Sequence, residues 1–528
     1  MNSKRYKSLG SLADLPEGRL TARKIGSKEF LLLRRGDRVF ISGNKCPHHG
    51  ARLSEGLAFG REVICPCHNA RFDMESGRVL CPPALDDIPV YHSGRQGEEV
   101  LVGPVRENRG LCLPSMAAPR GRRSKTIVIV GAGAAGNAAA DALRREGFAG
   151  KVLMLTRESD LPYDRTLLSK GFLSGNVTAE QLPLRSPEYY AAMGIEVLTS
   201  CTVDSLEPKE RRVVLENGRS IGYDKLLLAT GGAPRRLDVP GAGLPGAHYL
   251  RSRSDAAAIL ESLPSVDKVV ITGAGFIGLE VASALRKRGI AVRVVAPEKV
   301  PLTAAVGEEV GRWLQDLHAA AGVGFFLGRG IREISGSGRV EEVVLSDGSS
   351  YETDLVVIGV GIEPAVEYLR TTTLVRNGAV PVDSRLRTEL PDIYAAGDLA
   401  VVKGPDGRIT RIEHWVEAER QGRLAALSML GRGADPESVP FFWSEQQEVT
   451  LKCVGVPHPA HRRIVRGNLE EERFLMGFFN GCALEAAVAV GRDRDLIAAS
   501  RLIGNAVLLT PERFCDESTD LAALASDR

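Results

Sequence analysis

The sequence has no long uninterrupted apolar run. Among its 528 residues, no window of eighteen is free of charged and polar residues, so we expect no transmembrane helix. The first residues, MNSKRYKSLGSLADLPEG, lack an apolar segment and carry Asp14 and Glu17 early. We therefore expect neither an export signal nor a transit peptide.

The chain also lacks an excess of charge of one sign. Its 68 basic and 66 acidic side chains leave a net charge of +2, which gives no general attraction to nucleic acid or anionic lipid. The nine cysteines are odd in number and scattered, unlike a secreted disulfide framework. We expect a reducing compartment, hence a cytoplasmic protein. A chain of this length should contain about three or four domains.

The N-terminal part, 1–106, has the pattern of a small antiparallel β domain. Short apolar runs are separated by Gly, Asp and Asn, which is typical of strands joined by turns. These runs are 30–33, 39–41 and 61–64. The following stretch, 107–124, is rich in Pro, Gly and Arg without apolar periodicity, which indicates a linker.

After the linker, strands alternate with helices, as in a doubly wound α/β sheet. A buried strand over 127–130, a helix over 134–146 and a strand over 152–155 follow one another. This unit recurs, because 268–295 repeats the text of 127–155, and 343–361 repeats that of 213–231. The repeats predict two Rossmann-like dinucleotide-binding domains, one nested within the sequence of the other. Their predicted limits are 125–245 with 350–430, and 246–349, followed by an α+β domain over 431–528.

Four metal-ligand residues lie on two loops between predicted strands. Cys46 and His48 form a C-x-H pair, and after sixteen intervening residues Cys65 and His68 form a C-x2-H pair. Two thiolates and two imidazoles can bind either a tetrahedral zinc ion or a Rieske [2Fe-2S] cluster. Zinc modules usually place two residues or more inside each ligand pair, whereas this spacing resembles the Rieske family.

Within that family, Ala51 marks a subtype. Respiratory Rieske proteins have a cysteine at this place, which forms a disulfide with the other loop. With Ala51 the resemblance is to the ferredoxin-type Rieske domains of oxygenase systems, whose lower potential suits an electron delivered by a flavin.

Two glycine loops of GxGxxG type follow a strand and open a helix, a context that predicts dinucleotide binding. They permit a tight turn and bring the pyrophosphate close to the backbone. The loops are Gly131, Gly133 and Gly136, and Gly273, Gly275 and Gly278. An acidic residue after the next strand can bind the adenosine ribose. Glu158 fills that place in the first copy, a solvated surface Glu being the alternative. Glu298 fills it in the second and favours NADH, while Lys299 leaves NADPH open.

The segment LPYDRTLLSK at 161–170 resembles the flavin-crossing segment of the apoptosis-inducing factor and oxygenase-coupled ferredoxin reductase family. The resemblance implies that Arg165 and Lys170 lie at an FAD, and that Lys170 pairs with Glu280. This cation would stabilise negative charge on the reduced flavin, and Glu280 would limit its desolvation cost. The first dinucleotide domain is then the FAD domain and the second the NAD domain.

Further motifs of the same family imply further cofactor contacts. Phe276 should shield the nicotinamide pocket, and Asp398 should bind the ribityl chain. Trp443 should approach the flavin from the C-terminal domain, with a buried core aromatic as the alternative. The other residues expected at the cofactors are Thr230, Gly231, Gly361, Glu413, His414 and Trp415.

Together the motifs most resemble Rieske-containing, apoptosis-inducing-factor-like proteins. The resemblance implies electron flow from NADH through FAD to the cluster and on to an external acceptor, an oxygenase or another redox protein. The alternative is an NADH-responsive binding or signalling flavoprotein. A disulfide reductase is disfavoured because 136–185 contains no cysteine, and a fused nitrite reductase because the C-terminal cysteines are scattered. A homodimer is left open.

Overall fold

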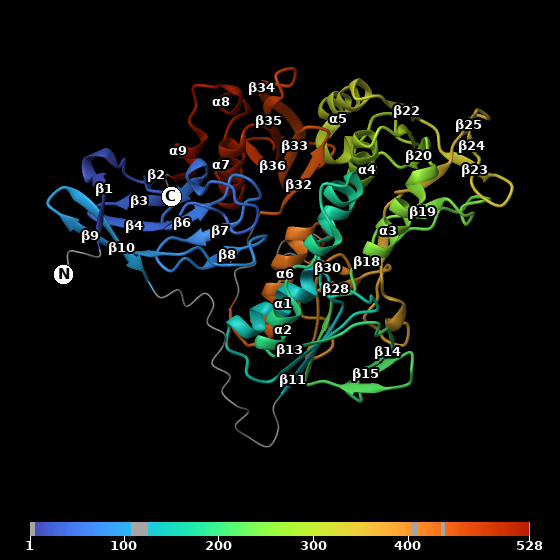
Figure 1. Cartoon of the computed structure of the whole chain (residues 1–528), viewed down its shortest axis with the longest axis horizontal. Coiled ribbons are helices and arrows are strands. Elements are labelled where there is room, and N and C mark those ends of the chain that lie inside the picture. The colour runs from blue at the N-terminus through green and yellow to red at the C-terminus, as the bar shows by residue number, and fades with distance from the viewer. Residues whose placement is uncertain (1–5, 107–124, 404–408, 434–438, 527–528) are drawn as a thin grey trace. The chain divides into compact units, whose positions relative to one another are not determined.

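The computed structural model describes residues 6–106, 125–403, 409–433 and 439–526, and the predicted linker 107–124 lies outside them. The described chain forms two compact units, whose helices and strands are labelled in Figure 1. The first unit contains 6–106, 439–443 and 452–526, and the second contains 125–403, 409–433 and 444–451. None of the described helices is long and apolar enough to cross a membrane. The domain limits given above stay predictions.

The N-terminal domain is all-β, as predicted, and the structure divides its strands among three small sheets. Alternating apolar residues such as Leu31, Leu33 and Phe72 fill its interior. The strands, in sheet order, are β2 (Leu20–Ile25), β3 (Lys28–Arg35) and β4 (Arg38–Gly43); β5 (Leu57–Phe59), β6 (Glu62–Ile64), β7 (Arg71–Asp73) and β8 (Val79–Cys81); and β1 (Lys7–Ser11), β10 (Glu99–Val105) and β9 (Tyr91–Gln96). The strands of these sheets pair antiparallel, and the three apolar runs named from the sequence lie in β3, in β4 and at β6.

Two five-stranded parallel sheets carry the repeated sequences and confirm the duplication. Their orders are β13 (Ile195–Leu198), β12 (Lys151–Leu155), β11 (Thr126–Val130), β17 (Lys225–Leu228) and β29 (Ile393–Ala395); and β22 (Val323–Leu327), β21 (Ala291–Ala296), β20 (Lys268–Thr272), β26 (Leu355–Ile358) and β19 (Ala247–Tyr249). Because β29 returns to the first sheet after the whole second sheet, the second domain is nested in the first, as expected.

Smaller sheets follow the parallel ones. Each copy has a three-stranded antiparallel sheet, β14 (Val203–Glu207), β15 (Arg212–Leu215) and β16 (Ser220–Gly222) in one, and β23 (Ile331–Ser335), β24 (Glu342–Leu345) and β25 (Ser350–Glu352) in the other. The remaining strands are β18 (Gly232–Pro234) with β27 (Ile362–Pro364), and β28 (Val380–Val382) with β30 (Ala400–Lys403) and β31 (Ile409–Thr410).

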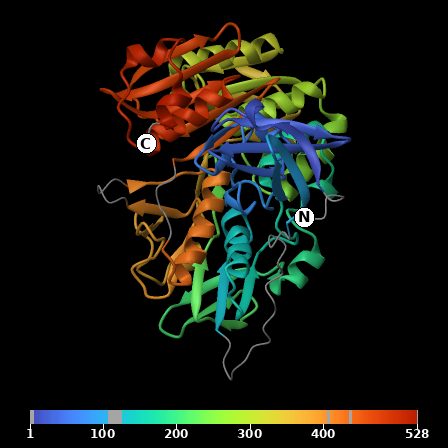
Figure 2. The same cartoon turned by 90° about the vertical axis from the view of Figure 1, so that its left-hand side faces the viewer.

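Helices of the second unit follow from Ala-rich and Leu-rich stretches with good helix propensity. Its helices are α1 (Ala134–Arg145), α2 (Pro187–Ala192), α3 (Arg253–Ser262), α4 (Phe276–Lys287), α5 (Thr303–Ala320) and α6 (Trp415–Met429). Helices α1 and α6 lie side by side (Figures 1 and 2). They approach closely because Gly422 has no side chain, since a Cβ there would lie 2.0 Å from the carbonyl oxygen of Ala135.

The C-terminal domain is a sheet with three helices. Its strand order is β32 (Phe441–Gln446), β33 (Val449–Gly455), β36 (Ala483–Val490), β35 (Arg473–Asn480) and β34 (Arg462–Asn468). Helix α7 (Asp493–Gly504), predicted over 494–503, packs beside β36 and α9 (Leu521–Ser526), and α8 (Pro511–Cys515) packs beside β34 (Figure 1). Residues 444–451, at the tip of the β32–β33 hairpin, belong to the second unit.

The α1–α6 contact yields a test of the packing. Gly422→Ala should lower the free energy of unfolding by about 1–3 kcal/mol, because the added methyl group overlaps a backbone carbonyl. Gly243→Ala is the matched control, since a Cβ at Gly243 meets nothing within 4 Å. Urea denaturation of both variants measures the effect, and equal stabilities would contradict this account of the packing.

Candidate cluster and flavin sites

The two loops that carry the predicted metal ligands fold alike. In each loop the backbone N–H of the cysteine donates to the carbonyl oxygen five residues further along. The distance is 2.8 Å from Cys46 to Ala51 and also 2.8 Å from Cys65 to Ala70. The same short turn therefore presents each thiol, which explains why two short sequence motifs suffice to build the site.

The two cysteines are buried, with 2% of Cys46 and 1% of Cys65 exposed. Backbone N–H groups two and three residues beyond each cysteine donate to its sulfur. A hydrogen bond between the two thiols lowers the pKa of Cys46 and raises that of Cys65, so the two groups titrate as a coupled pair. Such N–H donors stabilise thiolate ligands and tune the potential of iron–sulfur centres.

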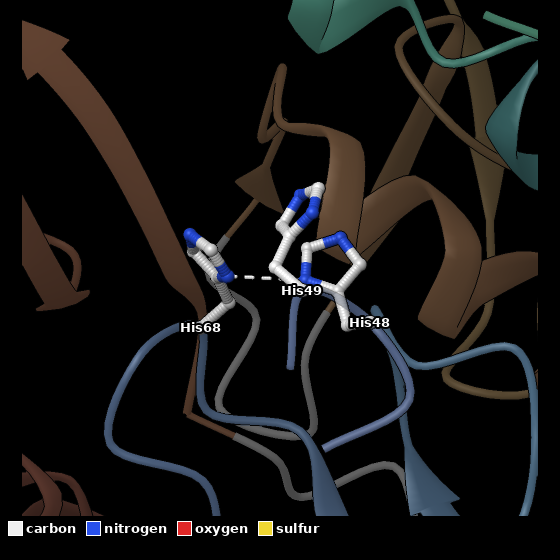
Figure 3. Close-up of side chains that lie close together, drawn as sticks. All are labelled: His48, His49 and His68. Atoms are coloured by element: carbon white, nitrogen blue, oxygen red, sulfur yellow. Dashed lines mark hydrogen bonds between the residues drawn. The ribbon is translucent and has the colours of Figure 1, made fainter. Parts of the chain in front are cut away.

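The imidazoles meet on the same side of the loops (Figure 3). The Nδ1 atoms of His48 and His68 lie 3.0 Å apart, and the ring of His49 is 3.8 Å from that of His48 between centroids. Burial lowers the pKa of His48 to about 3, so the ring is the neutral form that binds metals. Two thiols and two imidazoles on paired loops fit the two-cysteine, two-histidine donor set of a Rieske cluster. The structure adds a third imidazole, His49, which the sequence analysis did not count as a ligand.

Residues of the C-terminal domain lie against the cluster loops inside the first unit. The Trp443 ring is 4.2 Å from the His68 ring and 6.0 Å from the His48 ring, between centroids. The Lys452 ammonium donates to the carbonyl oxygen of Pro66 at 3.0 Å and pairs with Asp493 at 2.6 Å. Trp443 thus contacts a predicted metal ligand, while its predicted flavin contact stays a prediction. Lys452 carries no sequence signal, because it is one lysine in a strand far from the motif.

The first glycine loop joins β11 to α1. Gly131 has a φ of 108°, and a Cβ there would lie 2.2 Å from the carbonyl oxygen of Ala229. A Cβ at Gly136 would lie 1.9 Å from the Gly131 carbonyl oxygen, so this glycine lets the helix pack on the loop. Gly133, the N-cap of α1, faces open space, with nothing within 4 Å of its Cβ position. A helix N-terminus with free N–H groups and open space fits a pyrophosphate.

The second loop repeats this geometry between β20 and α4. Gly273 has a φ of 109°, and a Cβ there would lie 2.3 Å from the Gly359 carbonyl oxygen. A Cβ at Gly278 would lie 2.2 Å from the carbonyl oxygen of Gly273, and the N-cap Gly275 again has nothing within 4 Å. The two loops are therefore equivalent cradles for two dinucleotides.

Glu158, expected at the adenosine ribose, is held by the protein. The Tyr163 hydroxyl donates to its Oε2 at 2.6 Å, and Arg165 pairs with its Oε1. Burial alone would raise the pKa of Glu158, but the charge of Arg165 and the hydrogen bonds from Tyr163 and Arg165 lower it overall. The residue is thus not a solvated surface glutamate, and its ribose contact stays a prediction.

Arg165 also contacts Arg251, which forms an ion pair with the predicted flavin residue Asp398. The Arg165 Nη1 donates to the backbone carbonyl oxygen of Arg251 at 2.9 Å, and the Arg251 guanidinium pairs with Asp398 at 2.6 Å. A Cβ at Gly231 would lie 3.3 Å from that guanidinium, and Thr230 donates to a backbone carbonyl at 2.7 Å. The structure thereby gathers three predicted residues, Arg165, Asp398 and Gly231, around Arg251. Sequence reasoning missed Arg251, which has no motif of its own.

The predicted Lys170–Glu280 pair is present and buried. The Lys170 ammonium lies 3.1 Å from Glu280 Oε2, with 9% and 5% of the two side chains exposed. Lys170 lies in a π-helical turn, Leu168–Phe172, and Glu280 lies on α4. A buried ion pair is stable only when further hydrogen bonds satisfy its charges, and the Thr166 carbonyl oxygen accepts one from Lys170 at 3.0 Å.

The N-terminus of α6 holds three more predicted flavin residues. His414 is its N-cap, and burial lowers the pKa of His414 to about 4. Burial raises the pKa of Glu413 despite its contact with Arg411. Trp415 begins the helix and forms a hydrogen bond with Glu419.

The residues predicted on the nicotinamide side lie on other elements. Phe276 is half-buried at the start of α4, Glu298 is exposed after β21, and Gly361 has a φ of 99° before β27. Their contacts to cofactors stay predictions.

Two metal-binding loops and two dinucleotide cradles define the class: an iron–sulfur flavoprotein reductase. Comparison with protein families agrees, because residues 6–92 match the Rieske [2Fe-2S] domain, 125–422 the pyridine nucleotide-disulphide oxidoreductases and 441–525 the reductase C-terminal domain. The chain belongs to the pyridine nucleotide-disulphide oxidoreductase family. Its cofactors are FAD, a Rieske [2Fe-2S] cluster and a nicotinamide dinucleotide.

Individual relatives share both the sequence and the fold. Apoptosis-inducing factor 3 of Homo sapiens is 33% identical over 508 residues, which cover 93% of this chain and 83% of that protein. Rhodocoxin reductase of Rhodococcus erythropolis is 36% identical over 399 residues, covering 75% and 93%. The solved structure of a ferredoxin reductase from Rhodopseudomonas palustris superposes with a TM-score of 0.74 at 33% identity, covering 76% of this chain and all of that one. These relatives confirm the predicted fold class and family.

Substitution of the three neighbouring histidines tests which of them bind the cluster. His48→Ala and His68→Ala should lose most of their bound iron and the EPR signal of the reduced cluster, because each removes a nitrogen donor. His49→Ala is the control, since His49 lies in the same cluster of rings without belonging to the ligand pattern. Iron analysis measures the effect. Loss of the cluster from His49→Ala with retention in His48→Ala would reverse the assignment.

Glu419 provides a pH test. Its carboxyl is 2% exposed, its Oε2 has no hydrogen-bond partner among the described residues, and burial raises its pKa well above 4.5. The pKa of such a carboxyl group is higher in the folded chain than in the unfolded chain. Its contribution to the free energy of unfolding is therefore complete below the pKa of the unfolded chain and is lost as the pH rises toward the pKa of the folded chain. The stability of Glu419→Gln relative to the native protein should therefore increase as the pH rises above 4.5, measured by thermal unfolding of the FAD-loaded chain. A pH-independent difference would contradict burial of an ionisable carboxyl.

Proposed function

We propose that this chain oxidises NADH at its FAD and passes the electrons through its own Rieske cluster to an external redox protein. When bound, FAD converts the two electrons of a hydride into single-electron steps, and the cluster carries one electron at a time. The observation that carries the proposal is the contact of Trp443 with His68, because it joins a predicted cluster ligand to the reductase C-terminal domain in one compact unit.

The residues of the second unit have roles that suit this chemistry. The cradles at Gly133 and Gly275 bind and orient two dinucleotides through helix N-termini. Lys170 provides a cation whose charge favours a reduced, negatively charged ring, and Glu280 keeps that ammonium in place. Arg251 and Asp398 form a polar pair beside Gly231. We propose that this pair orients the polar chain of FAD.

In the first unit, Lys452 and Trp443 hold the cluster loop. The ammonium of Lys452 fixes the carbonyl of Pro66, between the two ligands of the second loop. Trp443 packs on the ring of His68 and excludes water from that side. A fixed ligand loop keeps the change of geometry on electron transfer small, which supports a role of the cluster in turnover.

Relatives support the choice of nucleotide and acceptor. The benzene 1,2-dioxygenase system ferredoxin–NAD(+) reductase subunit of Pseudomonas putida is 33% identical over 396 residues, covering 75% of this chain and 96% of that protein. A covalent putidaredoxin reductase–putidaredoxin complex also shares the fold, with a TM-score of 0.74 at 32% identity. We propose NADH as the donor, and an oxygenase component or a similar redox protein as the acceptor. The exposed thiols of Cys482 and Cys515 support a reducing, cytoplasmic location.

The alternative, an NADH-responsive binding or signalling flavoprotein, is less well supported. A pure sensor needs no electron outlet, whereas this chain retains all four cluster donors on two correctly folded loops. Relatives named as reductases match over 93% or more of their length.

A variant without the cluster tests the relay. Cys65→Ser should leave ferricyanide reduction by NADH near the native rate, because this acceptor can take electrons from the flavin. Reduction of cytochrome c, used as a protein acceptor, should fall at least about tenfold, since its electrons pass through the cluster. Cys515→Ser, at an exposed thiol, is the control. Unchanged cytochrome c reduction by an iron-free Cys65→Ser protein would contradict the relay.

A further inference from the structure

A line of buried, hydrogen-bonded polar side chains ends at Glu280, on the side of its carboxylate that faces away from Lys170. Its members come from α5 and from the tip of the β32–β33 hairpin, all within the second unit. They are His318 (0% exposed), Gln446 (0%) and Ser444 (1%). Neither the motifs nor the proposed function explains why polar groups are buried here, where apolar residues would be less costly.

The hydrogen bonds of this line have one consistent direction. Gln446 donates through Nε2 to the Ser444 hydroxyl oxygen at 2.7 Å, so its Oε1 accepts from His318 Nε2 at 2.8 Å. Burial lowers the pKa of His318 to about 4, which makes the ring neutral and its Nδ1 an acceptor. Gln447 Nε2 donates to that Nδ1 at 2.9 Å. The hydrogen bonds donated by Gln447, His318 and Gln446 therefore follow one another toward Ser444, and Gln446 Nε2 also donates to the Phe276 carbonyl oxygen at 3.5 Å.

The line ends on the carboxylate. Because the Ser444 oxygen accepts from Gln446, its own hydroxyl hydrogen is directed to Glu280 Oε1, at 2.5 Å. The Ser169 hydroxyl donates to the other oxygen, Oε2, also at 2.5 Å, and the Lys170 ammonium approaches the same Oε2 at 3.1 Å. Ser444 is thus the donor that fixes the oxygen facing away from Lys170, and it determines how the carboxylate is turned.

The hairpin tip is anchored on the helix that carries Glu280. The backbone N–H of Gln447 donates to the Ser283 hydroxyl oxygen on α4 at 2.7 Å, and Lys287 of the same helix pairs with Glu448 at 3.0 Å. Ser283 is buried like Ser444, but its hydrogen bond holds the hairpin and not the carboxylate. The chain therefore offers two buried serines with separable tasks.

We propose that Ser444 is a positioning residue for NADH-dependent reduction of the flavin, with Gln446 and His318 holding its hydroxyl in the donating orientation. The inference rests on the proposed function, because it assumes that Lys170 and Glu280 lie at the FAD. Without the Ser444 donor, one carboxylate oxygen is buried and unsatisfied, and Glu280 draws more strongly on Lys170. The cation is then less available to stabilise the reduced ring.

The decisive variants are Ser444→Ala, Ser444→Thr and Ser283→Ala, each as the FAD-loaded full chain. Ser444→Ala should slow flavin reduction by NADH about tenfold at saturating NADH with little change in the half-saturating concentration, because a hydrogen bond to a charged group is lost. Its flavin midpoint potential, measured by anaerobic dye equilibration, should become more negative. Ser444→Thr keeps the hydroxyl and should restore both values. Ser283→Ala should leave the midpoint potential native.

His318→Gln gives a second route to the same conclusion if Ser444→Ala binds FAD poorly. It removes the ring that orients Gln446, so the potential should shift in the same direction by a smaller amount. A native rate and potential in Ser444→Ala, or equal shifts in Ser444→Ala and Ser283→Ala, would overturn the positioning role. Failure of NADH to reduce the native flavin would instead overturn the proposed function.

Discussion

The buried carboxylate of Glu280 is the constraint on which the second unit depends. A charged group at 5% exposure is stable only if its lone pairs accept hydrogen bonds, and here the donors come from two separate parts of the chain. Ser169 and Lys170 come from the π-helical turn, and Ser444 comes from the C-terminal hairpin. The need to satisfy one charge thus joins the flavin-side motif, the NAD-domain helix α4 and the reductase C-terminal domain.

In the cluster loops, too, buried negative charges are stabilised by hydrogen-bond donors, but the charged groups are thiolates and the donors are backbone N–H groups. Thiolates are stabilised by backbone N–H donors, and the left-handed residues Gly50 and Asn69 close the turns that aim those donors, with φ values of 75° and 61°. Strand β32 supplies Trp443 to the first unit, where it contacts His68, and Ser444 to the second, where it contacts Glu280. The C-terminal domain therefore provides side chains both to the cluster loops and to the Lys170–Glu280 pair.

Local patterns predicted the fold and the cofactor motifs, because strand periodicity, glycine loops and ligand spacing are properties of short segments. The internal repeat even predicted the nesting that β29 shows. Partners distant in sequence were not predictable without a family resemblance. Arg251 meets Asp398 across 147 residues and Ser444 meets Glu280 across 164, so only the tertiary structure reveals them. Glu158 was assigned by its place after a strand, but no local signal shows that Arg165 and Tyr163 occupy its carboxylate.

The central claim is that flavin and cluster work in series in one chain. An anaerobic titration with NADH, followed by flavin absorbance and by EPR of the cluster, tests it most directly. The account predicts that NADH bleaches the flavin and that the EPR signal of the reduced cluster grows in the same samples, without any added protein. Bleaching of the flavin with a cluster that stays oxidised would contradict it.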